Sequence, residues 1–274
     1  MKKIVAINCS PRIAWNTSAL VREAADGAEK EGAQVVTFDL YQLDKYTGCV
    51  SCFGCKLPEN LGRCVCKDGL FRVLEEIRTA DGLIIGTPNY LGDVSAGFRA
   101  LYERLIFQSI TYKKEVRSYN SRQIPVLMIM TSNAAEAFYE KIGYDKMLQG
   151  YQNTLGAFVG PTKLLISTET LQVMDYDRYN WTMFDPEARK QRHETVFAED
   201  RKKAFALERK WQKNLGKRKR GNIYGIHGKE DRGKSLGAGA AGRTVLFADR
   251  RRQGCFGGYR LWRRYPFGLQ NGYG

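Results

Sequence analysis

Five short hydrophobic runs recur along the chain, and segments with helical periodicity separate them. The runs lack alternation between apolar and polar residues, which is typical of strands that are buried on both faces of a parallel sheet. Repeated alternation of strand and helix therefore predicts an α/β fold with a doubly wound parallel sheet. The five expected strands are Lys3–Asn8, Gln34–Leu40, Gly82–Thr87, Ile124–Thr131 and Lys163–Ser167.

The segments between these runs carry apolar residues three and four positions apart, so each presents one apolar face to a sheet. Small hydroxyl residues stand at the start of two of them, where they can cap a helix. The five predicted helices are one capped by Thr17 or Ser18, one at Leu70–Arg78, one capped by Ser95, one within Ala134–Leu155 that breaks near Gly143 or Gly150, and one at Phe197–Leu215.

Two stretches do not fit the plain alternation. Residues 171–194, between the fifth strand and the last helix, are rich in aromatic side chains. We expect them to form either a packing or oligomer surface or an ordered loop over the sheet. Residues 49–66, between the second strand and the second helix, contain five of the chain's seven cysteines.

The composition suits a folded core but is uneven along the chain. Of 274 residues 43% are hydrophobic, which is ample for a sizeable core. The formal net charge is +15, yet 14 of the 44 Lys and Arg and only 3 of the 29 Asp and Glu lie after residue 216. Residues 1–216 therefore carry only +4, and the basic charge says nothing about the partner of the folded part.

The last 58 residues, 217–274, hold 13 of the 28 glycines and keep no apolar period. We predict a folded domain over residues 1–216, followed by a basic tail that is disordered or a non-native translation such as a shifted reading frame. A nucleic-acid-binding protein that acts through this tail is a third functional hypothesis. The tail lacks repeated RGG units, so nucleic acid is not the expected partner.

The cysteines must be interpreted in the compartment where the protein works. The chain starts without a hydrophobic signal segment, and no apolar run approaches the ~18 residues of a membrane span. We therefore expect a cytoplasmic protein with reduced thiols and no membrane partner. In that setting clustered cysteines point to metal rather than to disulfides.

The spacing of the cysteine cluster predicts a metal centre. Cys49, Cys52 and Cys55 follow the pattern C-x2-C-x2-C, which puts three sulfurs on one tight loop, as in iron–sulfur cubanes. Cys64 or Cys66 can supply a fourth thiolate, and a four-thiolate zinc site is the alternative. Because the loop follows the second strand, we expect it at the same end of the sheet as the ligand-binding loops and interpret it as a redox relay.

Polar loops follow three of the predicted strands, at the sheet edge where doubly wound folds bind ligands. The first loop, Ser10–Ser18, combines hydroxyls, an amide and one guanidinium before a helix N-terminus, which indicates an anion site. The chain has no G-x-G-x-x-G motif and no Walker lysine there, which disfavours dinucleotide and P-loop sites. The loop at Thr87–Tyr90 forms a rigid shelf for a flat ring, and the loop at Thr131–Asn133 is again small and polar.

These motifs together resemble the flavodoxin-fold NADPH-dependent FMN reductase superfamily and, within it, the iron–sulfur flavoproteins. The resemblance covers roughly residues 1–216. It rests on the cysteine loop, on S-P-R-I-A-W-N-T-S at Ser10–Ser18, on T-P-N-Y and S-A-G-F-R-A-L-Y-E-R within Thr87–Arg104, and on D-Y-D-R-Y-N-W-T-M-F-D-P at Asp175–Pro186.

The resemblance implies a flavodoxin-like sheet of order 2-1-3-4-5, an FMN cofactor and a homodimer or tetramer. A [4Fe–4S] cluster would exchange electrons with the flavin, and the redox partner would be ferredoxin or NAD(P)H. The flavin performs the chemistry, so no side-chain acid or base is required, and His193 and His227 lie in no candidate site. The implied residues are Ser10, Arg12, Asn16, Thr17 and Ser18 for the phosphate, Thr87, Pro88, Asn89, Tyr90, Thr131, Ser132 and Asn133 around the ring, and Cys49, Cys52, Cys55 and Cys64 for the cluster.

Two hypotheses thus stand ahead of the nucleic-acid one. The first is an FMN-dependent oxidoreductase or electron carrier of the iron–sulfur flavoprotein type. The second is an NAD(P)H-dependent FMN or quinone reductase without a cluster, in which the cysteines bind zinc or nothing.

Overall fold

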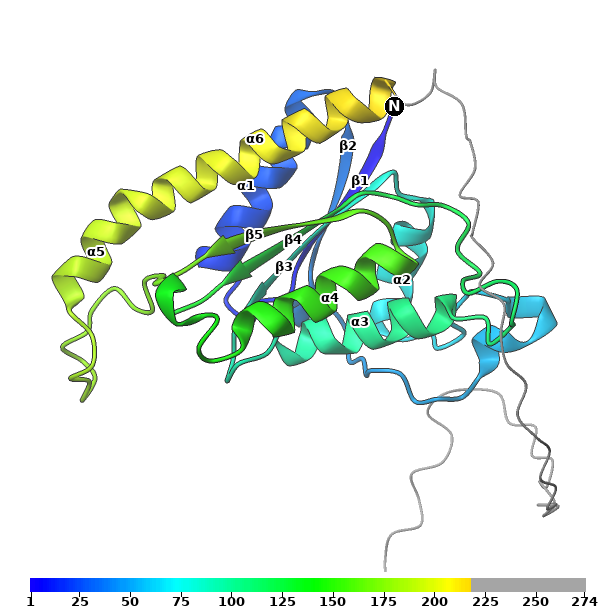
Figure 1. Ribbon diagram of the computed structural model, residues 1–274, viewed down its shortest axis with the longest axis horizontal. Coiled ribbons are helices and arrows are strands. Elements are labelled where there is room, and N and C mark those ends of the chain that lie inside the picture. The colour runs from blue at the N-terminus through cyan, green and yellow to red at the C-terminus, as the bar shows by residue number, and fades with distance from the viewer. Residues whose placement is uncertain (218–274) are drawn as a thin grey trace, which may run out of the picture. The chain divides into compact units, whose positions relative to one another are not determined.

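The computed structural model describes residues 1–217, with side chains described as far as Leu207. Apart from Lys217, the tail predicted at 217–274 lies outside these residues. The described part contains a five-stranded parallel sheet of order β2-β1-β3-β4-β5, as expected (Figure 1). The strands are β1 (Lys3–Asn8), β2 (Gln34–Asp39), β3 (Gly82–Pro88), β4 (Val126–Thr131) and β5 (Thr162–Ser167).

Helices cover both faces of the sheet (Figure 1). Two of them, α1 and α6, pack on one face around Leu20, Ile84 and Leu127, while α2, α3 and α4 pack on the other. None of the helices in residues 1–217 is long and apolar enough to cross a membrane. The helices are α1 (Asn16–Lys30), α2 (Gly69–Thr79), α3 (Ala96–Ser109), α4 (Tyr144–Phe158), α5 (Pro186–Glu194) and α6 (Val196–Lys217).

The central strands β1, β3 and β4 are buried almost throughout, whereas the edge strands β2 and β5 are partly exposed. The expectation of burial on both faces is therefore confirmed for the centre of the sheet and wrong for its edges. An edge strand has a neighbour on one side only, so its outer side chains reach solvent. Each apolar side chain buried in the centre contributes about 1.5–3 kcal/mol to folding.

The start of α1 differs from the prediction. Trp15 is the N-cap residue, and both Thr17 and Ser18 lie inside the first turn. Ser18 acts from the third helical position, where its Oγ accepts a hydrogen bond from the Trp15 N–H at 3.0 Å. The predicted cap of α3 is confirmed, since Ser95 Oγ accepts from the Phe98 N–H at 3.2 Å.

The fourth predicted helix begins later than expected, and residues 171–194 contain a helix that was not expected. Gly143, with φ at +79°, directly precedes α4, whereas Gly150 lies within the helix, so of the two alternative positions for the break Gly143 is the correct one. Helix α5 begins at Pro186, and the Asp185 carboxylate accepts from the N–H of Ala188 at 3.1 Å. An aspartate followed by proline is a common start signal for a helix, so this element was readable from the sequence.

Candidate functional site

The loops that follow β1, β3 and β4 meet at the carboxyl edge of the sheet, as the sequence predicted. The hydroxyl groups of Thr17 and Thr131 lie 2.7 Å apart, which joins the start of α1 to the end of β4. The Asn89 N–H donates to the Thr131 carbonyl at 2.8 Å, which joins the loop after β3 to the same point. The three polar loops therefore form one site rather than three separate turns.

The loop after β1 has the features of an anion site. The first N–H groups of α1 have no acceptors within the helix, and its first turn carries no acidic residue. Asn16, Thr17 and Ser18 are buried there. Ser10 orders the backbone before the helix, because its Oγ accepts a hydrogen bond from the Arg12 N–H at 3.1 Å.

The first residues of the aromatic stretch bind this loop. Arg12 Nη1 donates to the Gln172 carbonyl at 2.6 Å, and Asn16 Nδ2 donates to the Leu171 carbonyl at 2.7 Å. The Trp15 indole N–H also donates to the Leu171 carbonyl, and its ring lies 4.0 Å from the Arg12 guanidinium. Each of these bonds uses one N–H of its side chain, so both Arg12 and Asn16 keep further donors for an anion. The sequence could not indicate this contact, since its acceptors are backbone carbonyls.

The loop after β3 makes a tight turn beside the loop after β1. Tyr90 and Asp93 exchange backbone hydrogen bonds of 2.8 and 3.1 Å, and the two residues between them, Leu91 and Gly92, have φ of +54° and +87°. Burial and the nearby Tyr41 raise the pKa of Tyr90, while the neighbouring Arg12 opposes the rise. Tyr90 thus lies within electrostatic range of Arg12.

Two residues of the predicted shelf, Thr87 and Pro88, are buried and stabilise the loop from behind. Thr87 is fully buried, and its Oγ1 accepts from the Ser95 N–H at 3.0 Å. Ser95 Oγ in turn donates to the Cys9 carbonyl at 2.5 Å, so α3 begins from the point where β1 and β3 end. Pro88 ends β3 and is also buried. Asn89 and Tyr90 remain the residues of this loop that can face a ligand.

The loop after β4 is ordered by its neighbours. The Ser132 N–H donates to the Ser167 carbonyl at 2.9 Å, and Ser132 Oγ accepts from the Ala134 N–H at 3.0 Å. Asn133 Oδ1 accepts from Gln172 Nε2 at 2.5 Å, so the aromatic stretch contacts this loop too. The residues expected around the ring thus lie at one edge, with Gln172 between them and the loop after β1.

The five clustered cysteines line a single pocket. Ser51 and Phe53, between the first three cysteines, both have the left-handed φ that is uncommon for residues other than glycine, at +51° and +57°. Such backbone conformations persist where the surroundings hold them, often at functional sites. The lining comprises Cys49, Cys52, Cys55, Cys64 and Cys66 together with Phe53, Arg104, Phe107 and Gln108 among others.

Burial and neighbouring thiols both affect the pKa of two of these cysteines. Burial raises the pKa of Cys49, and so do the neighbouring Cys64 and Cys52 thiols. Burial likewise raises the pKa of Cys55, which lies beside Cys64 and Cys49, while Lys56 opposes the rise. The four thiols named for the cluster therefore form one interacting group.

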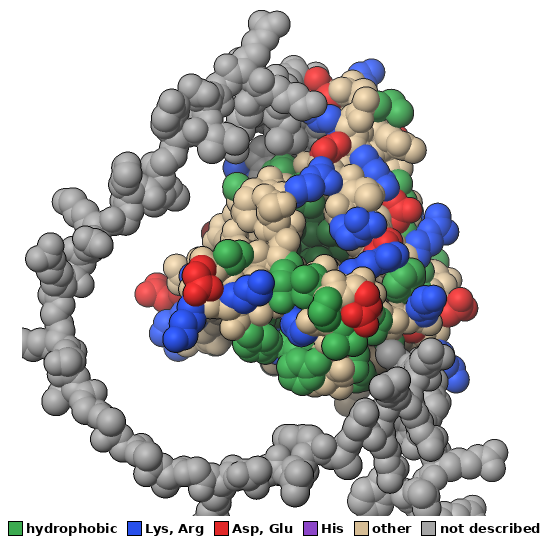
Figure 2. All heavy atoms as spheres, turned by 90° about the vertical axis from the view of Figure 1, so that its right-hand side faces the viewer, with side chains coloured by type: hydrophobic (Ala, Val, Ile, Leu, Met, Phe, Trp, Pro, Cys, Tyr) green, Lys and Arg blue, Asp and Glu red, His purple; other side chains and the backbone are tan. Residues whose placement is uncertain are grey.

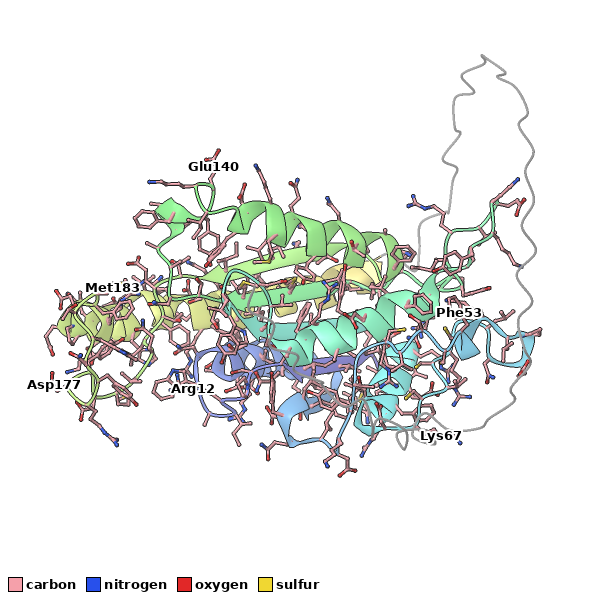
Figure 3. The ribbon with its side chains drawn as sticks, turned by 90° about the horizontal axis from the view of Figure 1, so that it is seen from below. Arg12, Phe53, Lys67, Glu140, Asp177 and Met183 are labelled. Atoms are coloured by element: carbon pink, nitrogen blue, oxygen red, sulfur yellow. The ribbon has the colours of Figure 1, made fainter. Side chains whose placement is uncertain are left out.

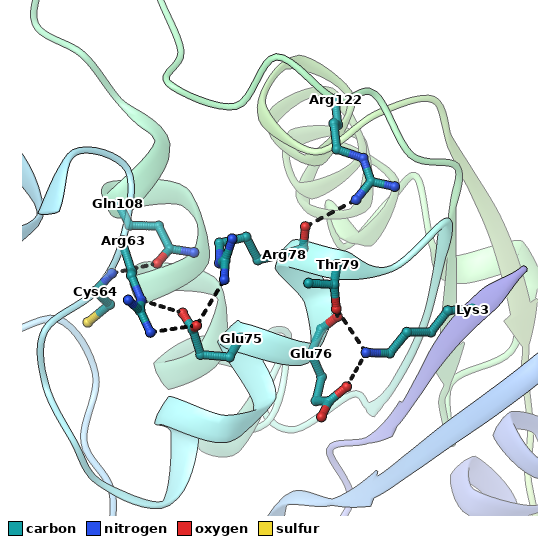
Figure 4. A network of polar contacts seen from close by, with 9 residues as sticks. All are labelled: Lys3, Arg63, Cys64, Glu75, Glu76, Arg78, Thr79, Gln108 and Arg122. Atoms are coloured by element: carbon teal, nitrogen blue, oxygen red, sulfur yellow. Dashed lines mark hydrogen bonds and ion pairs between the residues drawn. The ribbon is translucent and has the colours of Figure 1, made fainter.

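Helix α3 and helix α2 hold the cysteine loop in position. The Cys49 N–H donates to Glu103 Oε2 at 3.2 Å. The Cys64 N–H donates to Gln108 Oε1 at 2.9 Å (Figure 4). Next to Cys64, Arg63 forms a bidentate pair with Glu75 of α2, at 2.9 and 2.8 Å (Figure 4).

Lys56 adds a third anchor, at the C-terminus of α3. Its ammonium donates to the carbonyls of Gln108 at 3.2 Å and Ile110 at 2.6 Å, and to that of Phe107. The ammonium also lies 4.6 Å from the centre of the Phe107 ring. A cation is favoured at a helix C-terminus, so the residue after Cys55 is tied to α3 by charge as well as by hydrogen bonds.

Cys66 differs from the other four cysteines. It is 3% exposed, and its Sγ lies 3.9 Å from Asp68 Oδ2. Asp68 and Arg104 form an ion pair of 2.5 Å whose side chains are 1% and 2% exposed. Arg104 Nη2 also donates to the Cys66 carbonyl at 2.7 Å. The Cys66 thiol therefore contacts a buried ion pair, which was invisible in the sequence.

The cysteine pocket does not lie at the edge that carries the three polar loops, so the predicted position was wrong. Figure 3 shows Arg12 on the side of the domain that carries Asp177 and Met183, and Phe53 towards the opposite side. The chain leaves the carboxyl end of β2 and runs back along α3, past Tyr46 beside Gly97 and Gly48 beside Glu103. The connection from β2 to α2, residues 40–68, is long enough to reach far from its strand, and side-chain contacts with α3 decide where the cysteines lie.

The surface at this second end mixes apolar and basic side chains (Figure 2). Val50, Phe53, Leu57 and Leu61 of the cysteine loop are each about half exposed, at 52%, 51%, 49% and 47%. Within residues 1–217, no three His, Cys, Asp or Glu side chains are grouped as the ligands of a single metal ion.

Comparison with known proteins agrees with the fold and the motifs. The sequence profile of the family described as NADPH-dependent FMN reductase matches residues 2–139. An iron–sulfur flavoprotein of Methanocaldococcus jannaschii is 36% identical over 102 residues, which are 37% of this chain and 51% of that protein. An iron–sulfur flavoprotein of Archaeoglobus fulgidus is 34% identical over 104 residues, 37% and 48% of the two chains. The chain thus spans about half the length of these relatives.

Solved structures share the fold at low sequence identity. An NAD(P)H:quinone oxidoreductase from Methanothermobacter marburgensis superposes with a TM-score of 0.56 at 12% identity, covering 77% of this chain and 97% of its own. An azoreductase from Bacillus anthracis gives a TM-score of 0.56 at 11% identity, covering 77% and 100%. At such identities the likeness establishes a flavodoxin-like fold alone.

Proposed function

The chain belongs to the NADPH-dependent FMN reductase family, and on this premise we propose that it is a flavin-dependent oxidoreductase of the iron–sulfur flavoprotein type. It would bind FMN at the carboxyl edge of the sheet and a [4Fe–4S] cluster in the cysteine pocket. The observation that carries the proposal is that four thiols at cluster spacing line one pocket, on the helix that begins at the flavin site.

The residues at the sheet edge fit FMN by the chemistry of their donors. Arg12 and the N-terminus of α1 would hold the phosphate, with the buried Ser10, Asn16, Thr17 and Ser18 shaping its cradle. The remaining predicted residues, from Thr87 to Tyr90 and from Thr131 to Asn133, would border the isoalloxazine ring. The flavin supplies hydride and single-electron transfer when it is bound. The chain's part is to orient the ring and, through the aromatic stretch, to limit its contact with water.

The cysteine pocket fits a cubane by the nature and number of its thiols. Cys49, Cys52, Cys55 and Cys64 would be the four ligands, because the Cys66 thiol is engaged with Asp68. A cubane holds its thiolates on separate iron corners, farther apart than the ligands of one ion. In the described residues no three His, Cys, Asp or Glu side chains lie close enough to bind one metal ion, which is compatible with the wider spacing of cubane ligands.

Helix α3 connects the two sites. From its cap at Ser95, beside the flavin loops, to Arg104 in the cysteine pocket the helix advances nine residues, or about 13 Å at ~1.5 Å per residue. The helix thus holds the flavin shelf at one end and the cysteine pocket at the other. We propose that NAD(P)H or a ferredoxin-like protein supplies the electrons, and that the working form is a homodimer or tetramer.

A reductase without a cluster is the second candidate. It is favoured by the wide separation of the cysteine loop from Arg12, since an FMN reductase needs only the sheet-edge site (Figure 3). In that case the cysteines would bind zinc or remain free thiols.

An anaerobic absorption spectrum with FMN, iron and sulfide assays separates the two. About four irons and four sulfides per flavin, with broad absorbance that bleaches on reduction, are expected for the cluster-bearing protein. A clean flavin spectrum with no sulfide after reconstitution rejects the cluster and leaves the simple reductase. A chain that binds no FMN rejects both.

A further inference from the structure

Arg104 is a buried cation in the wall of the cysteine pocket. Its side chain is 2% exposed, and its charge is balanced by Asp68 at 2.5 Å. Nη1 donates to Asp68 Oδ1 and Nη2 donates to the Cys66 carbonyl. A guanidinium carries five N–H donors, so these two contacts leave part of it unused.

The third nitrogen of the guanidinium is the unusual one. Arg104 Nε is buried and has no hydrogen-bond partner among the described groups. An unsatisfied buried donor costs about 1–3 kcal/mol, and more when it is charged, so native proteins rarely keep one without a reason. Gln108 lies one turn further along α3, but its Oε1 accepts from the Cys64 N–H and not from Arg104 Nε.

The neighbour of this guanidinium is the thiol of Cys64. Arg104 and Cys64 both line the cysteine pocket, so the guanidinium and this thiol border the same cavity. The pocket therefore brings a fixed positive charge to one of the four proposed cluster ligands. The hydrogen bonds to Asp68 and to the Cys66 carbonyl fix the orientation of the planar guanidinium group of Arg104.

We propose that Arg104 is a positioning and potential-setting residue whose Nε–H donates to a sulfur of the cluster, either the Cys64 thiolate or an adjacent sulfide. This inference rests on the proposed function, because it needs a cluster in the pocket. One-electron reduction adds one negative charge to the cluster, with no bond made or broken. A hydrogen bond and a positive charge stabilise that more negative state, so Arg104 raises the reduction potential.

Two variants test the assignment. Arg104→Lys keeps a cation beside Asp68 but removes the Nε–H. The double variant Asp68→Asn with Arg104→Gln removes both charges together, which avoids leaving one buried charge unpaired. Asn also preserves the N-cap of α2, where Asp68 accepts from the Leu70 N–H at 3.1 Å. Arg72→Gln, at an exposed arginine of α2, is the matched control.

The measurements are made on the reconstituted full-length chain. We expect both variants to titrate at a more negative midpoint potential than the wild type, with Arg72→Gln unchanged. We also expect electron–nuclear double resonance of the reduced wild type, labelled with 15N-arginine, to show a nitrogen coupling that Arg104→Lys lacks.

The outcomes distinguish the inference from its premise. A wild-type chain that takes up no iron and sulfide overturns the cluster, and the inference with it. A wild-type cluster without 15N coupling overturns the role of Arg104 alone, even if the variants fail to fold. Unchanged midpoint potentials in folded, cluster-loaded variants overturn it as well.

Discussion

The hydroxyl groups of Thr17 and Thr131 lie 2.7 Å apart in the interior, although 114 residues separate them in the sequence. Thr17 belongs to the first turn of α1 and Thr131 ends β4, so the contact joins the loop after β1 to the loop after β4. Both residues are almost fully buried, at 2% and 4% exposure, and water therefore does not compete for either hydroxyl.

Replacing Thr17 by valine should destabilise the chain by about 1–3 kcal/mol, because the Thr131 hydroxyl loses its partner in the interior. The double variant Thr17→Val with Thr131→Val should recover part of this loss, since no hydroxyl is then left alone. Urea unfolding of the two single variants and the double variant measures the coupling. Additive losses would show that the two hydroxyls do not interact.

Replacing Arg12 by alanine should weaken FMN binding about 10- to 100-fold, since a hydrogen bond to a charged group is worth about 1.5–3 kcal/mol. Flavin fluorescence quenching measures the dissociation constant. Arg122→Ala is the control, because Arg122 pairs with Asp81 at the opposite end of the sheet. Equal affinity of the two variants would remove Arg12 from the phosphate site.

Replacing Cys64 by serine should abolish the proposed cluster, whereas Cys66→Ser should retain it. The reason is that the Cys66 thiol contacts Asp68, whereas Cys64 lies beside Cys49 and Cys55 in the pocket. Iron and sulfide per chain, measured after anaerobic reconstitution, decide the point. The reverse result would make Cys66 the fourth ligand and Cys64 the spare.

Replacing Gly27 by alanine should destabilise the packing of α1 against α6. An added Cβ would lie 2.3 Å from the Phe205 carbonyl oxygen, so the helices must move apart at a cost of about 1–3 kcal/mol. Gly150→Ala in α4 is the matched control, because its Cβ meets nothing within 4 Å. That variant should gain about 0.5–1 kcal/mol from helix propensity, and unfolding curves of both variants test the opposite signs.

Replacing Leu91 by glycine should stabilise the chain by about 1 kcal/mol. Leu91 is fully exposed at the tip of the turn after β3, with a left-handed φ of +54° that costs a non-glycine residue roughly 1–2 kcal/mol. Leu61→Gly is the comparison, since Leu61 is half exposed at an ordinary φ of −50° and should lose stability. Thermal unfolding of the two variants reports the difference.

The residues that the sequence identified correctly share a local signal. Runs without alternation predicted the buried strands β1, β3 and β4, and polar residues at the ends of these strands predicted loops that meet at the carboxyl edge of the sheet. Parallel strands bring their carboxyl ends to one edge, so the three polar loops had to meet. The cysteine spacing likewise predicted that the thiols would gather, because three of them share a short loop.

The tertiary structure alone decided where the two parts of the site lie and what surrounds them. A long loop has many possible paths. The path that carries the cysteines away from Arg12 is selected by the contacts of Cys49, Lys56 and Cys64 with α3 and the residue after it. The ion pair of Arg104 with Asp68 and the hydrogen bond from Asn16 to the Leu171 carbonyl are also contacts that only the tertiary structure shows. Such contacts join residues far apart in the sequence or use backbone atoms, which every residue carries, so neither spacing nor residue type announces them.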